Sequence, residues 1–289
     1  MALRVEIHFR AYERAWRSRG RAPFGNHSLR KDCGYDPRYK RRISAREAPP
    51  LTTATTETTR LTSDPVPPDE LRADVIRLFE AMAAGGIGIV PLDVAYAVVA
   101  TTPGGIRRIF EAKRRSYEKP SGMFGSWRLS REVHRLDERR HAMVRELVEQ
   151  ERIPFSVVAP FRTDHPLFAA VDPFVMQNSS KGGTLDMLIN AGQFHDAIAE
   201  GAITHGTAVF GSSANLSLTG SKYRYADIDA PVREAAAIHF DYGQSKYAHK
   251  DGLASTIIDF GDFSVIRVGH CFDRLKQAFA ARFGITLRT

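Results

Sequence analysis

Three short stretches of the sequence combine cationic, hydroxyl and amide side chains at spacings that suit the binding of an anion. The densest is EAKRRSYEKP at 111–120, in which Lys113 and Arg115 stand two residues apart near a predicted helix end. A lysine offers a compact charge and an arginine a planar fork, so the pair suits a phosphate or a carboxylate. A solvated helix end, whose cations are stabilised by the helix dipole, is the other interpretation.

The second stretch, GSSANLSLTG at 211–220, follows an apolar run. Ser213 and Asn215 present a hydroxyl and an amide where a predicted strand ends. In open α/β sheets ligands collect beyond the strand ends, and such groups can hold phosphate oxygens or a purine edge. The alternative is an Asx or Ser turn that caps the following segment.

The third stretch is GLASTIIDF, followed closely by VIRVG. Ser255 begins a predicted strand, and Arg267 lies inside an otherwise apolar one, where a guanidinium needs a partner. An anionic ligand is one candidate partner. Asp259, or another carboxylate, is the other.

Composition and charge exclude several classes of protein. The chain has 289 residues, 43% of them hydrophobic, and a formal charge of +8. All of this excess lies in residues 1–60, because the rest of the chain carries as many acidic as basic residues, so bulk attraction of the folded part to nucleic acid is not implied. No apolar run approaches the roughly 20 residues that span a bilayer, and Cys33 and Cys271 are read as free thiols of a cytoplasmic protein.

The periodicity predicts an extension over 1–68 and one folded domain over 69–289. The extension is basic and rich in Thr and Pro, which is typical of disorder; a targeting arm and a basic RNA-binding tail are the alternatives. Helices and strands interleave in the domain, which favours an α/β fold with a mixed sheet. One long helix is predicted over 131–151, with His134 and His141 facing solvent. The other helices are predicted at 69–84, 103–115, 193–202 and, closing the domain, 271–284. The strands are predicted at 87–92, 121–127, 155–161, 184–189, 207–213, 254–260 and 263–269, and the segment 232–243 is predicted to hold a helix end and a strand.

In their order and spacing these stretches resemble the YrdC-like family, which includes the threonylcarbamoyl-AMP synthases of tRNA modification. GGIGIVPLDVAYAV resembles the family's opening strand and turn, and IFEAKRRSYEKP resembles its Lys-x-Arg segment. GSSANLSLTG resembles its Ser-x-Asn-x-Ser signature, and ASTIIDF with VIRVG resembles its ending. The resemblance covers roughly 69–270.

The resemblance implies a twisted mixed β-sheet with flanking helices and an open concave face. It also implies that ATP, as its Mg²⁺ complex, is joined with bicarbonate and a small amine such as L-threonine, releasing pyrophosphate, and that partner proteins complete the tRNA modification. It implies no bound prosthetic group and no protein-held metal. The catalytic residues stay unknown, and a chemistry that depends on positioning explains why the sequence has no obvious base or nucleophile. The contacts that it implies are Lys113, Arg115, Ser213, Asn215, Ser255 and Arg267 for ATP and its phosphates, and Asp93, Tyr96 and Lys119 for the amine substrate.

The departures from the family pattern fall mostly in the amine half of the site. Leu92 and Val94 stand where the family has two threonines, and Leu188 stands near the place of a common arginine. Ser116 replaces a proline. Because a site that hydrogen-bonds a hydroxyl discriminates strongly through it, these changes predict an altered preference. Two hypotheses stay open: an enzyme that uses threonine or another amine, and a non-catalytic protein that binds nucleotide, tRNA or double-stranded RNA.

Overall fold

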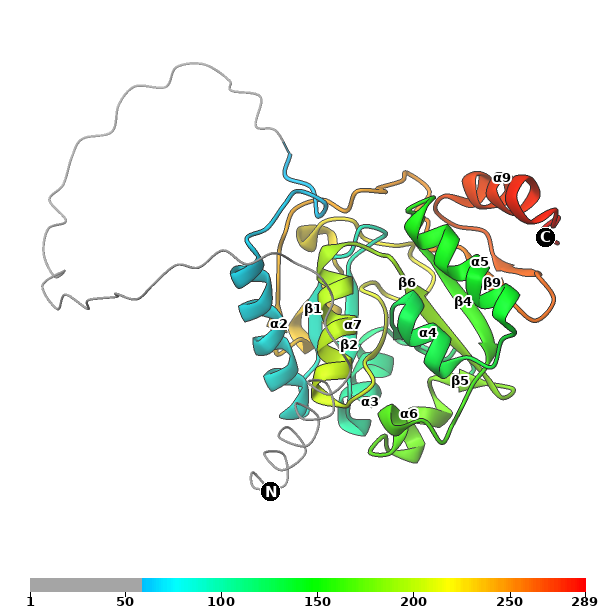
Figure 1. Cartoon of the computed structure of the whole chain (residues 1–289). Helices are drawn as coiled ribbons and strands as arrows, with labels where there is room; N and C mark the ends of the chain where they lie inside the picture. Colours follow the sequence, from blue (N-terminus) through cyan, green and yellow to red (C-terminus); the bar gives the residue numbers. More distant parts are fainter. Residues whose placement is uncertain (1–58) are drawn as a thin grey trace, which may run out of the picture. The chain divides into compact units, whose positions relative to one another are not determined.

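The computed structural model describes residues 59–289, and residues 1–58 lie outside the described part (Figure 1). The chain divides at this point into two units, Met1–Thr58 and Thr59–Thr289. The expectations for the basic arm and for Cys33 therefore fall outside the described residues.

The folded unit starts earlier than the boundary at residue 69 that the sequence predicts. Leu61 forms a β-bridge with Gln244, and Thr62 Oγ1 donates a hydrogen bond of 2.8 Å to Asp93 Oδ1. Val66 is buried in the core. The end of the Thr- and Pro-rich stretch is thus part of the domain, because its backbone pairs with Gln244 and the Thr62 side chain bonds to Asp93.

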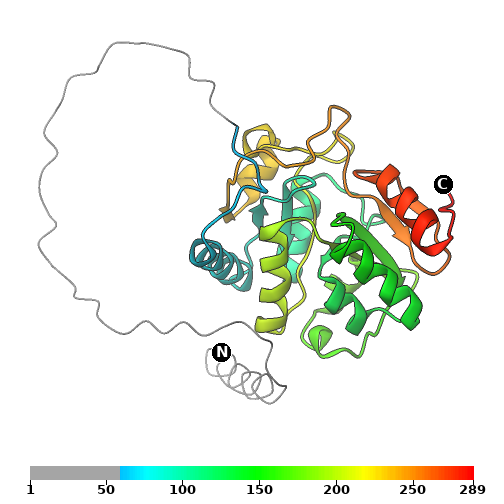
Figure 2. The ribbon, with the colours of Figure 1, turned by 45° about the horizontal axis from the view of Figure 1, so that its top comes forward.

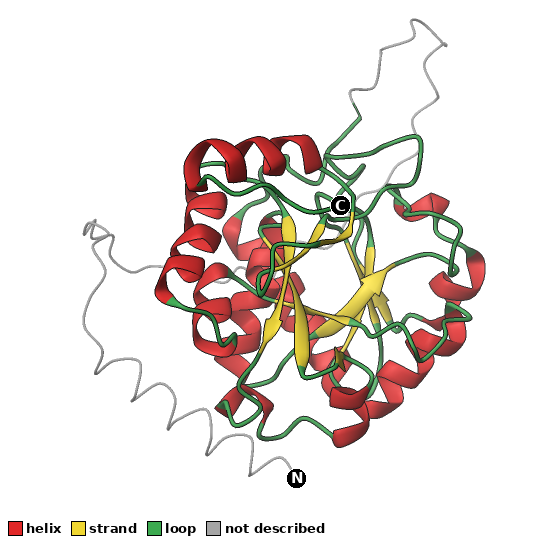
Figure 3. Cartoon of the chain, turned by 90° about the vertical axis from the view of Figure 1, so that its right-hand side faces the viewer, coloured by secondary structure: helices red, strands yellow, loops and turns green. Residues whose placement is uncertain are grey.

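The folded unit is built on one ten-stranded mixed sheet, which Figure 3 shows in yellow among the helices. Its order is β10-β9-β4-β6-β3-β7-β2-β1-β8, with β5 paired to β6. The pairs β3–β6, β4–β9 and β1–β8 are parallel, and the others are antiparallel. The strands are β1 (Gly88–Val90), β2 (Ala97–Ala100), β3 (Gly122–Phe124), β4 (Phe155–Pro160), β5 (Ser180–Lys181), β6 (Thr184–Ile189), β7 (Phe210–Ser213), β8 (Ile238–His239), β9 (Ile257–Asp259) and β10 (Val265–Arg267).

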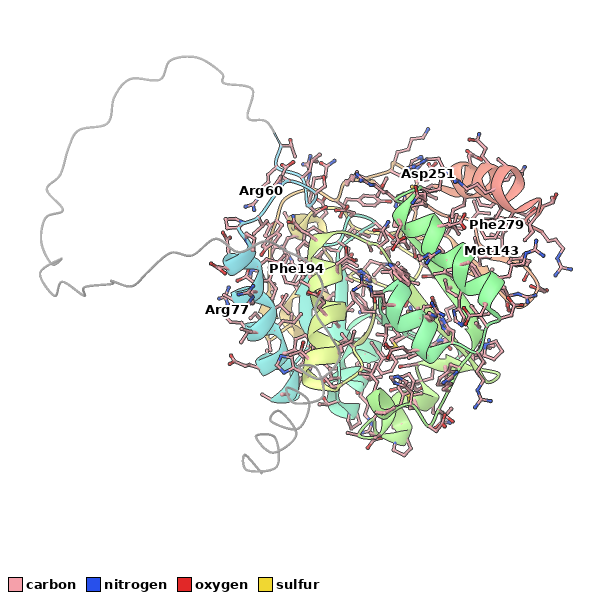
Figure 4. The ribbon with its side chains drawn as sticks, in the orientation of Figure 1. Arg60, Arg77, Met143, Phe194, Asp251 and Phe279 are labelled. Carbon is pink, nitrogen blue, oxygen red and sulfur yellow. The ribbon has the colours of Figure 1, made fainter. Side chains whose placement is uncertain are left out.

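Helices cover both faces of this sheet, which confirms the predicted α/β fold. Figures 1 and 2 both show α2 and α7 side by side. Alternate residues of a strand point to opposite faces of the sheet and so belong to two different cores. On β2, Val99 packs with α2 and α7, while Val98 packs with α3. Figure 4 labels one aromatic side chain from each core, Phe194 and Phe279. The helices are α2 (Pro68–Ala83), α3 (Pro103–Ala112), α4 (Trp127–Val133), α5 (Glu138–Glu149), α6 (Pro173–Gln177), α7 (Gln193–His205), α8 (Ala230–Ala235) and α9 (Phe272–Phe283).

The prediction of one helix over 131–151 is wrong, because the segment is broken into α4 and α5. His134 leaves the helical region, with φ −76° and ψ 142°, and Asp137 caps α5 by accepting a 2.8 Å hydrogen bond from the Arg140 amide. An aspartate at this position satisfies one of the free amides at a helix start. The break therefore divides the charged segment into two separate helices.

His134, predicted to face solvent, is buried beneath β6. Its Nε2 donates to the Leu185 carbonyl at 3.2 Å, and its Nδ1 accepts from the Ser130 hydroxyl at 2.9 Å. Burial lowers the pKa of His134 to about 4. The imidazole is therefore neutral at pH 7, and its two hydrogen bonds connect α4 to β6.

The C-terminal hairpin is confirmed, since β9 and β10 pair antiparallel. Strand β2 is absent from the sequence prediction because the segment before it is read as part of a turn. None of the helices that the structure describes is long and apolar enough to cross a membrane.

Candidate active site

A cavity of about 650 Å³ opens over one face of the sheet. The strand alternation explains its floor: on β6 the side chains of Thr184, Asp186 and Leu188 line the cavity, while those between them are buried in the opposite core. Gly122 lies beside Asp186 in the parallel register of β3 and β6. Small residues at this point leave the face of the sheet open.

Most of the predicted contact residues surround this cavity. Those that line it are Tyr96, Arg115, Lys119, Ser213, Ser255 and Arg267. Lys113, Asn215 and Asp93 lie outside its lining and have roles within the protein. The prediction that Lys113 and Arg115 reach into one cleft is therefore met by Arg115 alone.

Lys113 fastens the end of α3 to the exit of β7. Its ammonium donates to the Ser213 carbonyl, and to the Asn215 carbonyl at 2.6 Å. Burial, with a contribution from the nearby Arg115, lowers the pKa of Lys113 to about 7. Lys113 thus positions residues that reach the cavity.

The polar side chains at the end of β7 bond to one another. The Ser213 hydroxyl donates to Asn215 Oδ1 at 2.5 Å, and Asn215 Nδ2 donates to the Leu216 carbonyl at 2.5 Å. Both of the interpretations of this stretch have support in the geometry, since it forms an internally bonded turn and also presents Ser213 to the cavity.

Two arginines stand at the cavity with their orientation fixed by neutral oxygen partners. Arg115 donates from Nε to the Lys119 carbonyl at 2.9 Å and from Nη2 to the Pro120 carbonyl at 2.7 Å. Arg267 donates from Nε to the Ser255 carbonyl at 2.9 Å and from Nη2 to the Ser255 hydroxyl at 3.0 Å. Because these partners are neutral, each guanidinium keeps its full charge available to an anion.

The partner of Arg267 differs from the carboxylate that the sequence suggests. Asp259 Oδ1 instead accepts the Gly261 amide at 2.7 Å. Arg267 is solvent-accessible within the cavity, yet surrounding atoms lower its pKa by desolvation. A guanidinium in this setting still stays charged at pH 7.

Asp93 and Tyr96 brace the turn between β1 and β2. Asp93 accepts from Thr62, and burial raises its pKa. The Tyr96 hydroxyl lies 2.7 Å from both Asp241 Oδ1 and the Gly243 carbonyl. Their contacts hold a turn whose other side chains face the cavity.

Those other side chains make one part of the cavity apolar. Leu92, Val94 and Phe124 are buried in the core beneath α2 and α7, and Leu188 packs against them. All four line the cavity. We call this group the apolar wall.

Asp186 is the cavity residue that sequence reasoning misses. Burial raises its pKa, whereas Arg267, the Ser156 hydroxyl and Arg115 act in the opposite direction. Its Oδ1 is enclosed and has no hydrogen-bond partner among the described residues. An aspartate in the middle of the predicted strand TLDMLI is the signal that could have found it. We call Arg115, Asp186 and Arg267 the charged floor.

Residues 59–289 contain no group of three or more His, Cys, Asp or Glu placed to hold a metal ion.

The family model Sua5/YciO/YrdC, described as telomere recombination, matches residues 80–269. The chain belongs to this family. The match confirms the resemblance to YrdC-like proteins, while no curated protein sequence matches the chain.

Solved structures of Sua5/YciO/YrdC proteins share the fold. A double variant of Sua5 from P. abyssi aligns with a TM-score of 0.59 and 15% identity over 80% of this chain and 64% of its own. P. abyssi Sua5 complexed with L-threonine gives 0.54 and 16%, over 71% of this chain and 56% of its own. E. coli YciO gives 0.53 and 16%, over 73% and 95%. The chain thus spans less than two thirds of the length of that Sua5.

Proposed function

We propose that the chain joins ATP, bicarbonate and a small amine into a carbamoyl-adenylate and releases pyrophosphate. The observation that carries this proposal is the pair Arg115 and Arg267, which line one cavity and whose hydrogen bonds all go to neutral oxygens. Two such forks beside the hydroxyls of Ser213 and Ser255 suit a polyphosphate. Membership of the Sua5/YciO/YrdC family supports nucleotide chemistry of the threonylcarbamoyl-AMP synthase type.

In this proposal the chemistry depends mainly on positioning. The amine forms a C–N bond to bicarbonate with loss of water, which gives a carbamate. A carbamate oxygen then attacks the α-phosphorus, while the bond from phosphorus to the oxygen bridging the α- and β-phosphates breaks and pyrophosphate leaves. Arg115 and Arg267 hold phosphate oxygens and stabilise the charge that develops on them, and Mg²⁺ arrives as part of the nucleotide substrate. Lys113 keeps Ser213 in place through its bonds to the β7 exit. Holding the reactants together can supply much of the rate, which fits a site without an evident nucleophile.

The finer assignments follow from the same proposal. The product would serve tRNA threonylcarbamoylation or a related modification, in the cytoplasm and with partner proteins that transfer it. L-threonine is the reference acceptor, because a similar structure, P. abyssi Sua5, is a complex with L-threonine.

A second candidate is a nucleotide- or RNA-binding protein without turnover. The observation that favours it is the apolar wall, since Leu92 and Val94 cannot bond a substrate hydroxyl. RNA affinity would then rest on the basic residues 1–60 and would fall steeply with salt.

The test is pyrophosphate release from ATP and bicarbonate with Mg²⁺, screened across L-threonine and other small amines. We expect release that needs both the amine and bicarbonate, and that falls about a hundredfold in Arg115→Ala through loss of a preorganised cation. Arg108→Ala is the matched control, because Arg108 is an exposed arginine on α3 outside the cavity. ATP binding without release for any amine would favour the binding protein instead.

A further inference from the structure

Asp186 lies where the charged floor meets the apolar wall. It is two residues from Leu188 on the same face of β6, about 7 Å along the strand. Its other neighbours are Arg115 and Arg267, which act on its pKa through their charge. A ligand that contacts Asp186 can therefore touch the apolar wall and the phosphate-binding arginines at once.

Within residues 59–289, one oxygen of this carboxylate, Oδ1, is unsatisfied although the Ser156 hydroxyl and two cations stand nearby. Among the described residues, Asp186 has no ion pair within 4.0 Å, and its Oδ1 has no hydrogen-bond partner. The two arginines direct donors to carbonyl and hydroxyl oxygens instead. An enclosed carboxylate oxygen without a hydrogen-bond partner costs stability, and a ligand that donates a hydrogen bond to Oδ1 would remove that cost.

The backbone leaves room for this carboxylate. A methyl group at Gly122 would come within 3.3 Å of Asp186 Oδ2, a closer approach than most side chains make. The side chain as a whole is partly exposed to the cavity. Asp186 is thus placed to accept a hydrogen bond from a bound molecule.

The wall beside it defines the rest of that molecule. Leu92, Val94, Phe124 and Leu188 offer no donor or charge, so they suit an alkyl body and would leave a carboxylate unpaired. In the proposed function the two arginines are committed to phosphates and cannot serve such a carboxylate. Lys119 and Lys181 also line the cavity, but both are exposed, so the charged group beside the apolar wall is Asp186.

We infer that Asp186 binds the ammonium group of the acceptor, and that the acceptor is a primary amine with an apolar body and no carboxylate. This inference deepens the proposed function and rests on it for the role of the arginines. It makes Asp186 the residue that selects the acceptor, with the nitrogen held at the boundary between wall and floor, where the ammonium gives up a proton to solvent before it forms the carbamate.

Calorimetric titration of the full chain tests the inference without turnover. The probes are 3-methylbutylamine, 3-methylbutan-1-ol and L-leucine, which share one alkyl body and differ in the ammonium and the carboxylate, with L-threonine as the reference. Each is titrated with and without Mg²⁺ and α,β-methylene-ATP. We expect the amine to bind about tenfold or more tightly than the alcohol or either amino acid, the size expected for a hydrogen bond to a charged group.

Asp186→Asn is the decisive variant, because it keeps the shape and removes the charge. We expect it to weaken binding of the amine about tenfold and to leave the alcohol unchanged. Asp259→Asn is the matched control, since Asp259 lines the same cavity but its Oδ1 already accepts a backbone amide. It should leave the affinity for the amine as in the wild type.

Should Asp186→Asn not fold, Gly122→Ala supplies the test by crowding Oδ2. A few-fold loss for the amine alone is then expected. Equal or tighter binding of either amino acid, or an amine affinity that Asp186→Asn and Gly122→Ala leave intact, overturns the inference. Heat from Mg²⁺ alone that is lost in Asp186→Asn, without an effect on the amine, would assign the carboxylate to the metal and overturn it too.

Binding of the nucleotide analogue separates this inference from the proposed function. If the analogue does not bind while amine binding still depends on Asp186, the adenylation proposal fails and the amine site stands. If the analogue binds and the amine shows no preference, the acceptor assignment fails and adenylation stands.

Discussion

The apolar wall and the charged floor line one cavity, yet different forces hold them in place. The wall residues are part of a packed core under α2 and α7, so their positions follow from apolar contacts. Each floor arginine is oriented by two hydrogen bonds to carbonyl or hydroxyl oxygens on neighbouring segments. A change in the wall therefore alters shape and stability together, whereas a change in the floor alters charge with little repacking.

The largest effect is expected where the floor depends on a buried cation. Lys113→Met should lower the free energy of unfolding by about 4 kcal/mol, because it leaves carbonyl groups of Ser213 and Asn215 buried without a donor. Denaturant titration measures the change. Lys119→Met is the control, since this exposed lysine uses only its backbone carbonyl in the floor. An equal loss in both variants would contradict the role given to Lys113.

The next largest effect is expected at His134, which lies beneath β6, the strand that carries Asp186 of the charged floor and Leu188 of the apolar wall. Burial holds the pKa of His134 at about 4, below its usual 6.5, so the unfolded chain binds the proton first as pH falls. Stability should therefore drop between pH 6.5 and 4 by about 3 kcal/mol, and His134 should contribute no further change below pH 4. Unfolding curves of the wild type and of His134→Gln across this range make the comparison. If His134→Gln does not reduce the slope of the free energy of unfolding against pH in this range, the drop belongs to other groups.

Restoring hydroxyls to the wall tests whether it sets acceptor preference. The double change Leu92→Thr and Val94→Thr should improve binding of L-threonine relative to 3-methylbutylamine by about tenfold, since each hydroxyl can bond the substrate. The same change should cost about 2 kcal/mol of stability through lost apolar burial. Competition calorimetry measures the preference. An unchanged ratio of affinities would mean that the wall only packs.

The smallest effect is expected at the floor when charge is kept. Arg267→Lys should weaken binding of α,β-methylene-ATP only a few-fold, about 1 kcal/mol, because the charge stays and the fork onto Ser255 is lost. Arg267→Ala should weaken binding of the analogue considerably more than Arg267→Lys does. Equal losses would show that the shape of the fork matters more than its charge.

The wall and floor also differ in how far the sequence predicts them. Arg115, Ser213, Ser255 and Arg267 reach the cavity as predicted, because strand ends and their loops carry residues to predictable edges. The burial of Lys113 was not predictable, since the direction of a long side chain at a helix end depends on packing. The place of Asp186 in the cavity is not predictable from the sequence, because strand alternation shows which face of the sheet Asp186 is on only when the neighbours of β6 are known.

The same limit applies to the fold. Strands with clear apolar runs and helices with a regular period were predicted, as in α2 and in the β9–β10 hairpin. The break at His134–Asp137 was missed, because the surrounding charges keep a helical period and only the cap and the burial of His134 interrupt it.

Strand β6 has a consequence for how such a cavity can change over generations. Thr184, Asp186 and Leu188 face the cavity, while Leu185, Met187 and Ile189 belong to the opposite core. Point mutations at the three cavity positions can therefore change ligand preference while the packing of the core on the opposite face of β6 stays the same. An inserted or deleted residue would exchange the two sets and bury the carboxylate. Divergence within such a lineage should proceed by substitution at these three sites, and a library confined to them samples new specificities on a constant scaffold.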